Sequence, residues 1–386
     1  MVKTIKIAYV PGDGSGPEMM AQASVIAIEA AKKDSISIEF IETPMGWNAY
    51  EKFGDTLPEE SFKKASELGL IFFGGVGDFK HDSTIGIRKP ELKPETRVLL
   101  AIRKSLGLLI NIRPITFYKS LDHLANVKES AIPEEGITQI WVRYLLEDSY
   151  FGNPDLIPFI PIDVINNIGI KLKKDITGKE EIVTDLAYYK KSTLEKYLRY
   201  AMSLARDLKL PFISIDKANV MPRYDYWRKI TEQIAKAEFP EIKVISQLVD
   251  SANALLFTPS KLHGVIACGN EHGDILSDGA ASAVGSMGMM CSSSINPDTK
   301  AAFFESGAGT APTIAGQDKA NPLGRILTAA LMLRHIGAIS GAAAIENAVN
   351  KTLHDGFRTC DIITSTDDVS KLLGTSAMGK KVLSNL

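Results

Sequence analysis

The sequence predicts an α/β fold, because short apolar runs alternate with amphipathic stretches along most of the chain. Residues 70–73 are consecutive apolar residues stopped by Gly74 and Gly75, the pattern of a short buried strand. Residues 194–208 instead carry their apolar side chains at helical spacing. No internal repeat is visible, so a solenoid or propeller is not indicated.

The spacing of apolar residues also predicts the individual strands and helices. Strands are predicted at residues 5–10, 36–42, 70–73, 108–112, 138–144, 212–215, 244–249 and 265–268. Helices are predicted at residues 19–32, 96–105, 194–208, 224–237 and 274–284. The strand at 108–112 is expected to stop at Pro114. The C-terminal third is expected to be mostly helical, and residues 153–185 to form a loop or a peripheral hairpin.

Bulk composition excludes several functional classes. The chain has 386 residues, of which 45% are hydrophobic and 23% charged, enough for two domains or one large one. A net charge of -2 gives no electrostatic reason to expect binding to nucleic acid or to an anionic membrane. No apolar run approaches the roughly 20 residues of a spanning helix, and no signal pattern opens the chain. A cytoplasmic protein is therefore expected.

The three cysteines do not predict a metal site or a disulfide framework. Cys268, Cys291 and Cys360 form no CxxC or Cys/His spacing. They are expected to be buried free thiols in a reducing compartment.

A glycine-rich turn at residues 12–18 follows the first predicted strand. It suggests a Rossmann fingerprint, but the third glycine of that motif would stand where the chain has Pro17. A plain tight turn and a loop that lines a ligand remain the two alternatives, since glycines let a backbone approach a ligand closely.

Asp274 and Asp278 are four residues apart on a predicted helix and therefore share a face. Two like charges at that spacing repel each other and favour a counter-cation, and carboxylate oxygens suit Mg²⁺ or Mn²⁺. The alternative is an acid that stabilises the start of a helix beside a second, solvated acid.

Other candidate side chains lie on or beside predicted elements. Arg103, Arg113 and Arg143 could together hold a diacid, because guanidinium groups bind carboxylates through two hydrogen bonds; scattered surface arginines are the alternative. Lys217 and Asp250 follow predicted strands, where reactive groups of α/β folds gather.

In their order along the chain, several segments resemble the isocitrate and isopropylmalate dehydrogenases, a family of metal-dependent β-decarboxylating dehydrogenases. The segments are residues 12–18, 100–104, 111–114, 150–152, 216–220, 273–278, 309–312 and 320–322. Each segment alone is weak, but their co-occurrence in order is specific. The chain is closer to the 3-isopropylmalate dehydrogenase branch.

The resemblance implies a fold that is not a Rossmann domain. The family has an open mixed sheet flanked by helices and divided into two lobes. The first lobe is expected to contain residues 1–108 and 285–386, with the nucleotide-binding loops. The second is expected to contain residues 109–284, with the dimer contact and the metal-binding acids.

The resemblance also implies a reaction, the oxidative decarboxylation of a malate-type 2-hydroxy diacid with hydride transfer to a nicotinamide. The residues implied to bind the substrate are Leu99, Arg103, Arg113 and Arg143. Those implied to hold Mg²⁺ or Mn²⁺ are Asp274, Asp278 and, supplied by a second subunit, Asp250. Lys217, also from the second subunit, is implied to assist removal of the hydroxyl proton, and Tyr150 to protonate the enol. A homodimer with shared active sites follows.

The dinucleotide segment departs from the family pattern. The residues implied to bind the cofactor are Gly307, Gly309, Thr310, Ala311, Thr313, Ile314 and Asn321. NAD-dependent members carry a histidine and an aspartate where this chain has Ala308 and Thr313. NAD is expected, with NADP as the alternative, since a neutral Thr313 would not repel a 2′-phosphate. The same departures allow a regulatory or ligand-binding paralogue with weakened nucleotide binding.

The substrate segment leaves alternatives open too. Leu99 resembles isopropylmalate enzymes, which house an alkyl group at this position, whereas Arg97 could reach an extra carboxylate. Isocitrate, homoisocitrate and tartrate therefore remain alternative substrates. Tyr144 replaces the acid that usually follows the third clamp arginine, and the sequence assigns it no role.

Overall fold

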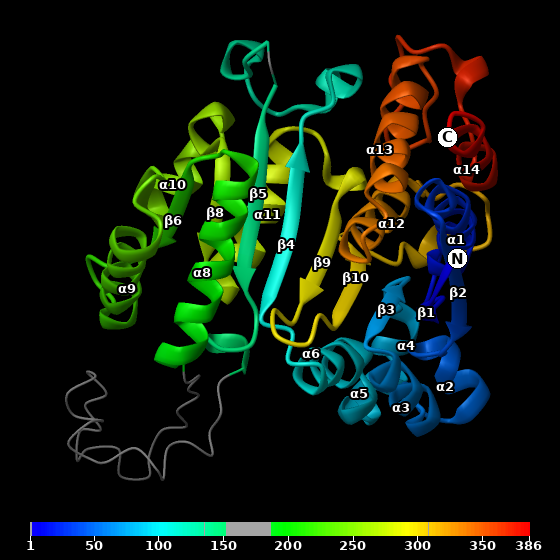
Figure 1. Cartoon of the computed structure of the whole chain (residues 1–386). Helices are drawn as coiled ribbons and strands as arrows, with labels where there is room; N and C mark the ends of the chain where they lie inside the picture. Colours follow the sequence, from blue (N-terminus) through cyan, green and yellow to red (C-terminus); the bar gives the residue numbers. More distant parts are fainter. Residues whose placement is uncertain (1, 135, 152–186, 308) are drawn as a thin grey trace.

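The computed structural model describes residues 2–134, 136–151, 187–307 and 309–386 (Figure 1). The hairpin expected at residues 153–185 lies outside this part of the chain. Within it, no helix is both long and apolar enough to cross a membrane.

The described residues form one sheet of ten strands in the order β2-β1-β3-β10-β9-β4-β5-β8-β6-β7. The strands are β1 (Lys3–Val10), β2 (Ile36–Glu42), β3 (Leu70–Phe73), β4 (Ile110–Thr116), β5 (Thr138–Tyr144), β6 (Phe212–Asp216), β7 (Val244–Leu248), β8 (Gly264–Cys268), β9 (Cys291–Ile295) and β10 (Ala302–Ser306). Strand β9 is antiparallel to both of its neighbours, β10 and β4, and β4 is antiparallel to β5; the other neighbouring pairs are parallel. The open mixed α/β fold predicted from the sequence is confirmed.

Helices cover both faces of this sheet. They are α1 (Gly16–Ala31), α2 (Trp47–Phe53), α3 (Glu59–Leu68), α4 (Phe79–Asp82), α5 (Ile85–Arg88), α6 (Ala101–Ser105), α8 (Lys191–Leu208), α9 (Pro222–Glu238), α10 (Val249–Leu255), α11 (Asn270–Ala283), α12 (Leu323–His335), α13 (Ile339–His354) and α14 (Thr375–Ser384). A π-helical segment, η3 (Glu95–Leu100), leads directly into α6.

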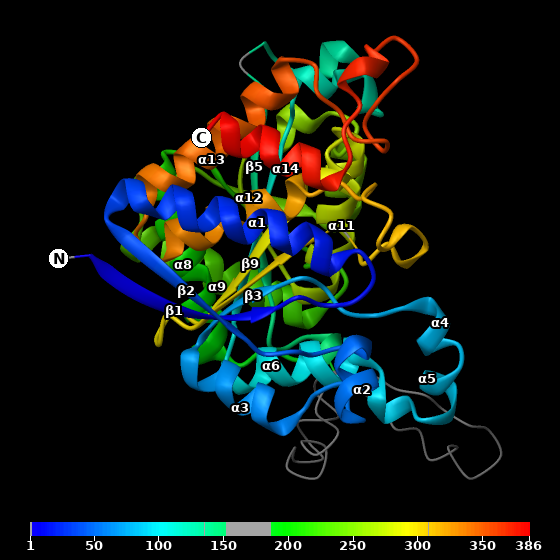
Figure 2. The same ribbon diagram turned by 90° about the vertical axis from the view of Figure 1, so that its right-hand side faces the viewer.

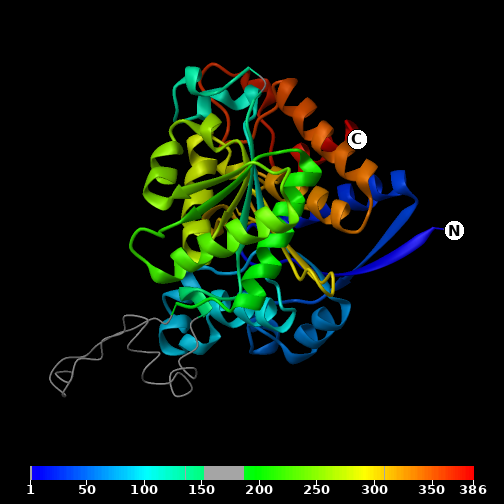
Figure 3. The same ribbon diagram turned by 60° about the vertical axis from the view of Figure 1, so that its left-hand side comes forward.

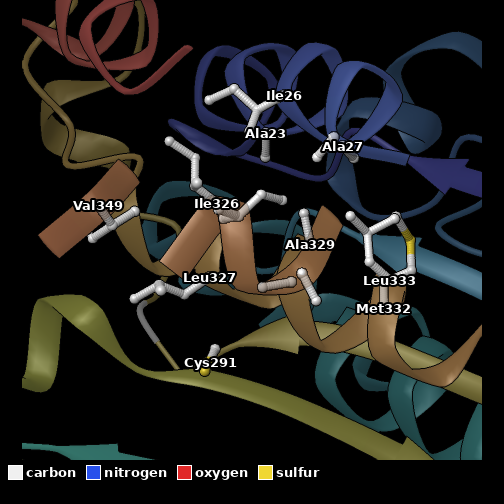
Figure 4. Packing of buried hydrophobic residues seen from close by; sticks show 14 of the residues in the cluster. Ala23, Ile26, Ala27, Cys291, Ile326, Leu327, Ala329, Met332, Leu333 and Val349 are labelled. Carbon is white, nitrogen blue, oxygen red and sulfur yellow. The ribbon is translucent and has the colours of Figure 1, made fainter. Parts of the chain in front are cut away.

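One half of the sheet, strands β2, β1, β3, β10 and β9, has helices α1, α12, α13 and α14 on one face and α3 and α6 on the other (Figure 2). Alternation along β1 explains this layering: Ile7 packs into the first layer, and Ala8 and Val10 into the second. Helices α1 and α12 pack through short side chains such as Ala27 and Ala329 (Figure 4).

The other half, strands β4, β5, β8, β6 and β7, is layered in the same way (Figure 3). Neighbouring residues of β5 point to opposite faces: Val142 packs with α8 and α9, and Trp141 packs with α10 and α11. Strands from residues 1–108 and 285–386 occupy one half of the sheet, and those from 109–284 occupy the other. The division into two lobes itself stays a prediction.

The structure bears out most predicted elements and corrects several. The strands at 36–42, 70–73 and 138–144 match their predicted bounds. The C-terminal third was expected to be mostly helical, but it begins with β9 and β10, two short strands in the middle of the sheet. Burial in the sheet, which no local pattern reports, decides their conformation.

Two further predictions about element bounds were wrong. Strand β4 continues through Pro114 to Thr116. Its pairing with β9 ends at Ile112, and a proline is tolerated where one side of a strand has no partner. Helix α11 begins at Asn270, so Asp274 lies inside the helix, and Glu271 is the acid of its first turn.

Candidate active site

The alternation of strands β4 and β5 aims two of the predicted clamp arginines at helix α11. Arg113 shares a face of β4 with Ile115, and Arg143 shares a face of β5 with Trp141. Both apolar residues pack in the layer of α10 and α11. The arginines therefore extend toward the helix that carries Asp274 and Asp278.

On α11 the two acids and the two arginines meet. Arg113 lies 2.9 Å from Asp274 and 3.0 Å from Asp278, measured between guanidinium nitrogen and carboxylate oxygen. Arg143 donates to the same Asp274 oxygen as Arg113, and its Nε donates to Asn270 at 2.8 Å. Arg143 is almost fully buried. The network therefore holds the positively charged guanidinium group of Arg143 away from water.

The third predicted arginine approaches from the opposite half of the sheet. Arg103, on α6, lies 3.0 Å from Glu305 at the end of β10. Its charge also acts on Asp274 and Arg143. Three arginines, from α6, β4 and β5, thus act on the same acid, Asp274.

The electrostatics of the site reflect this crowding. Burial and the neighbouring Arg113 lower the pKa of Arg143 to about 10. Burial acts to raise the pKa of Asp274, but Arg143 and Arg113 outweigh it and hold that pKa below its usual value. The pKa of Asp278 is raised, first by burial and also by the charge of Asp274.

Tyr150 lies at the edge of the same cluster. Its hydroxyl is 3.3 Å from Asp274, and the Arg143 guanidinium lies 5.4 Å from the centre of its ring. Burial and the Asp274 charge raise the pKa of Tyr150, so the phenol keeps its proton. The ring is partly exposed and can reach a bound molecule.

Lys217 and Asp250 lie outside this cluster and form an ion pair with each other. Lys217 follows β6, and Asp250 lies in the first turn of α10. Among the described residues, no group of three or more His, Cys, Asp and Glu side chains is arranged to hold a metal. Asp250 therefore does not join Asp274 and Asp278 within one chain.

The pair Asp274 and Asp278 nevertheless suits a divalent cation. Their donors are carboxylate oxygens, and burial, together with the charge of Asp274, raises the pKa of Asp278. Half of the Asp278 side chain is exposed, so its carboxylate is open to a cation from the solvent. Two oxygen donors from one chain leave room for others from a substrate or a second copy.

Three loops meet where the dinucleotide was expected. The loop after β1, the loop after β3 and the loop after β10 are joined by Thr310: its carbonyl accepts from Ser15, and its hydroxyl donates to the Gly77 carbonyl at 2.7 Å. Asp13 reinforces the junction and accepts backbone hydrogen bonds from Trp47 and Gly77. We call these three loops the nucleotide cradle.

The glycine-rich turn packs closely against the other two loops of the cradle. A Cβ at Gly12 (φ +82°) would lie 2.0 Å from the Gly75 carbonyl oxygen. A Cβ at Gly14 (φ +56°) would lie 2.4 Å from the Thr310 carbonyl oxygen. Both positions need glycine because the loops pack backbone to backbone. The turn is therefore part of a shared loop cluster, not an isolated tight turn.

The other residues predicted to bind the cofactor lie along the third loop of the cradle. Gly307 packs against Met290, and Gly309 has open space around it. Ala311 has a left-handed backbone with φ 39°, and it leads into a short helical turn, Pro312–Ile314. Thr313 is exposed in that turn.

Asn321 lies farther along, just before α12. Its side chain accepts from the Leu323 backbone at 2.9 Å and donates to Asp361 at 3.0 Å. Ala308, the residue that departs from the family pattern, lies outside the described residues.

The segment before Arg103 bears on whether the substrate carries an extra carboxylate or an alkyl group. Arg97 makes two hydrogen bonds to Asp55, at 2.8 and 2.6 Å. Leu99 is partly buried and packs with the apolar layer of α3 and α6. The guanidinium expected to reach an extra carboxylate is thus already paired with Asp55, whereas Leu99 has no polar partner to lose.

Sequence reasoning missed Glu305 and the role of Asp13, and it assigned no function to Tyr144. Tyr144 is buried and donates to Glu147 at 2.6 Å, so it belongs to the packing behind the site. A signal for Glu305 existed: an apolar run, residues 301–304, stands directly before it, and Gly307 follows two residues later, as Gly74 follows residues 70–73. That run was assigned to a helical region, so the strand end went unnoticed.

Fold and site together define an α/β enzyme for a small anionic substrate. The chain belongs to the isocitrate/isopropylmalate dehydrogenase family, whose family model matches residues 6–382.

Similar proteins support the same family. The chain is 37% identical over 377 residues to the 3-isopropylmalate dehydrogenase of Priestia megaterium, covering 97% of this chain and 94% of that protein. It is 35% identical to the 3-isopropylmalate dehydrogenase of Thermotoga maritima, covering 99% of both. Among solved structures, isocitrate dehydrogenase from Methylococcus capsulatus superposes with a TM-score of 0.76 at 26% identity, over 99% of both chains.

Proposed function

We propose that this chain catalyses the oxidative decarboxylation of 3-isopropylmalate, or of a malate-type 2-hydroxy diacid with a similar alkyl group, with NAD as the hydride acceptor. The observation that carries the proposal is the convergence of Arg103, Arg113 and Arg143 around Asp274. Relatives that carry the name 3-isopropylmalate dehydrogenase cover nearly the whole chain and support the substrate class.

The wall of the site favours an alkyl substituent over a third carboxylate. Leu99 offers apolar surface, and Arg97 is held by Asp55 through two hydrogen bonds. A third carboxylate would have to displace Asp55 from Arg97 before it gained a partner. An isopropyl group instead gains apolar contact at no electrostatic cost.

The protein side chains then have distinct roles. The arginines bind the two substrate carboxylates and exchange their present contacts with Asp274 and Glu305 for them. Tyr150 keeps its proton and delivers it to the carbon that loses carboxylate. Lys217 takes part in removing the hydroxyl proton.

Asp274 and Asp278 would hold Mg²⁺ or Mn²⁺. When bound, the cation supplies Lewis-acid polarisation of the substrate oxygens and the nicotinamide accepts the hydride. The matching test is chelation: EDTA should abolish turnover, and Mn²⁺ or Mg²⁺ should restore it.

NAD rather than NADP is proposed as the acceptor. Residues 356–362 resemble the NAD-dependent branch, whereas Thr313 adds no charge that would reject a 2′-phosphate. The ratio of kcat/KM for NAD and NADP tests this preference. Thr313→Asp should raise the ratio, because a carboxylate repels the 2′-phosphate.

A second copy of the chain is proposed to complete the site. Exposed apolar side chains stand close in sequence to Lys217 and Asp250 and on α11 itself; they are Val220, Met221, Phe257 and Ile275. Such a patch is typical of a protein interface. Lys217 and Asp250 of one copy would then face Asp274 and Asp278 of the other.

Mixing inactive variants tests the shared site. Lys217→Met and Asp274→Asn dimers, mixed and reassembled, should recover about a quarter of wild-type activity, because half of the dimers are mixed and each has one intact site. Recovery of no activity, with mixed dimers demonstrated, would contradict the shared site.

A substrate panel tests the reaction itself. Steady-state rates with 3-isopropylmalate, isocitrate, homoisocitrate, tartrate and malate are compared with Mn²⁺ and either dinucleotide. The highest kcat/KM is expected for 3-isopropylmalate. Absence of turnover on all five would reject the proposed function, and calorimetry with each dinucleotide would then detect a regulatory protein that binds only the diacid.

A further inference from the structure

Arg325 is a fully buried arginine on α12 that has no place in the reaction described above. Only 1% of its surface is exposed. Its Nη1 donates to the carbonyl of Ser306 at 3.3 Å, at the point where β10 ends and the third loop of the nucleotide cradle begins. A Cβ added at Gly75 would lie 2.9 Å from its Nη2. The guanidinium therefore contacts two of the three loops of the cradle.

Helix α12 is closely attached to this strand end. Thr328, one turn after Arg325, donates to the carbonyl of Glu305 at 3.2 Å. A Cβ at Gly324 would lie 2.9 Å from the Ser306 hydroxyl oxygen. Such close packing leaves little room for Ser306 to move unless Arg325 moves with it.

Glu305 links the clamp arginine of the diacid site to the end of β10. Its carboxylate lies 3.0 Å from Arg103, the clamp arginine of the diacid site, and both side chains are nearly buried. Its charge also acts on Arg325, where it opposes the burial that lowers the pKa of that guanidinium to about 10. A row of contacts thus runs from Arg103 through the Glu305 carboxylate and the backbone of Glu305 and Ser306 to Thr328 and Arg325.

Binding at either end must redistribute these charges. A substrate carboxylate that pairs with Arg103 competes with Glu305 for the same guanidinium. In a poorly solvated environment, the loss of one partner strengthens the pull of Glu305 on its other neighbour. That neighbour, Arg325, holds the first residue of the loop that is to bind the dinucleotide.

We propose that Glu305 and Arg325 couple the diacid site to the nucleotide cradle, so that a bound diacid tightens dinucleotide binding and the reverse. Arg325 is a positioning residue that acts through Ser306 and Gly75. The inference rests on the proposed function, which places a diacid at Arg103 and a dinucleotide at the cradle. Linkage requires the effect to be equal in both directions.

A dead-end complex measures the coupling without turnover. NADH fluorescence is titrated with and without saturating 3-isopropylmalate and Mg²⁺, because neither ligand can react with the other. NADPH is titrated in parallel. In the wild-type protein the diacid is expected to tighten NADH binding about tenfold, within the usual range of coupling between sites.

Two variants interrupt the contacts between the diacid site and the cradle, one at Arg325 beside the cradle and one at Glu305 beside Arg103. Arg325→Met and Glu305→Gln should each reduce the coupling to within about twofold of none. The double variant should lose no more than either single variant, because both act in one chain of contacts. Arg325→Lys keeps the charge but not the planar fork and should retain part of the coupling.

Arg334→Met is the matched control, since Arg334 lies on the same helix but is exposed and paired with Glu346. Its coupling should equal that of the wild type. Circular dichroism melts establish that each variant is folded; if Arg325→Met does not fold, Glu305→Gln and Arg325→Lys decide.

The outcomes separate the two proposals. Wild-type protein that binds neither dinucleotide nor diacid contradicts the proposed function, and with it the coupling. Wild-type protein that binds both ligands without mutual tightening contradicts the coupling alone. So do folded Arg325 and Glu305 variants that retain the full wild-type coupling.

Discussion

The diacid site and the nucleotide cradle are built in opposite ways. The diacid site consists of charged side chains paired with one another, such as Arg113 and Arg143 with Asp274. In the cradle the loops pack backbone against backbone, as where Gly14 meets Thr310, and the Thr310 hydroxyl and the Asp13 carboxylate join them. Charged side chains can exchange a partner for a ligand, whereas a cradle of backbone atoms presents a fixed shape. A substrate recognised by charge and a cofactor recognised by shape suit these two constructions.

Removing the charge of Asp274 should impair the diacid site and leave the nucleotide cradle unaffected. Asp274→Asn takes away a proposed metal ligand and leaves Arg113 and Arg143 without their shared anion. We expect kcat/KM to fall on the order of 10³-fold, while the Kd for dinucleotide measured without diacid stays unchanged.

The control for this variant is Asp225→Asn, which removes an exposed acid paired with Lys229 on α9. It should retain wild-type kcat/KM. A weakened dinucleotide Kd in Asp274→Asn would show that the two constructions are not separate.

Removing the hydroxyl group of Tyr150 should show whether this residue donates a proton in the diacid site. Tyr150→Phe keeps the ring beside Arg143 but loses the proton donor. We expect kcat to fall roughly 10²–10³-fold with KM within about threefold, the pattern of a lost general acid. Tyr200→Phe, on α8, should leave both parameters unchanged. A rise in KM with unchanged kcat would instead assign Tyr150 to binding.

Adding one methyl group at Gly12 should disturb the nucleotide cradle and leave the diacid site unaffected. Gly12→Ala forces a Cβ against the Gly75 carbonyl in a left-handed conformation. We expect a loss of about 3 kcal/mol in the free energy of unfolding, from strain and overpacking together, with about tenfold weaker dinucleotide binding. The diacid Kd measured alone should not change.

Gly54→Ala separates strain from packing, because Gly54 has a similar φ of +75° but no atom within 4 Å of a Cβ. Urea denaturation should show a loss of only about 1 kcal/mol for this variant. Equal losses for the two variants would mean that close packing of the loops contributes nothing.

The smallest effect concerns the border of the diacid site. Asp55→Asn frees Arg97 from its charged partner. We expect the kcat/KM for isocitrate relative to 3-isopropylmalate to rise about fivefold, while stability changes by less than about 1 kcal/mol, since the pair is one-third exposed. Glu346→Gln, which frees the exposed Arg334, serves as the control. An unchanged ratio would remove Asp55 and Arg97 from substrate selection.

Sequence periodicity predicted elements best where the buried side chains are apolar. The strand at 138–144 and the helix at 194–208 follow such patterns and agree with β5 and α8. It failed at Cys291–Ile295, where three serines lie in a fully buried strand. Polar residues there satisfy partners across the sheet: Asn111 donates to Ser292 and Ser294. A local pattern cannot register a partner that lies far away in the sequence.

For the site, the amino-acid sequence alone determined which charged residues exist, and the family resemblance implied which of them act together. Only the tertiary structure decided the partners. It paired Arg97 with Asp55, Arg103 with Glu305 and Lys217 with Asp250. The physical reason is that an ion pair depends on distance in space, and the packing of separate elements sets that distance.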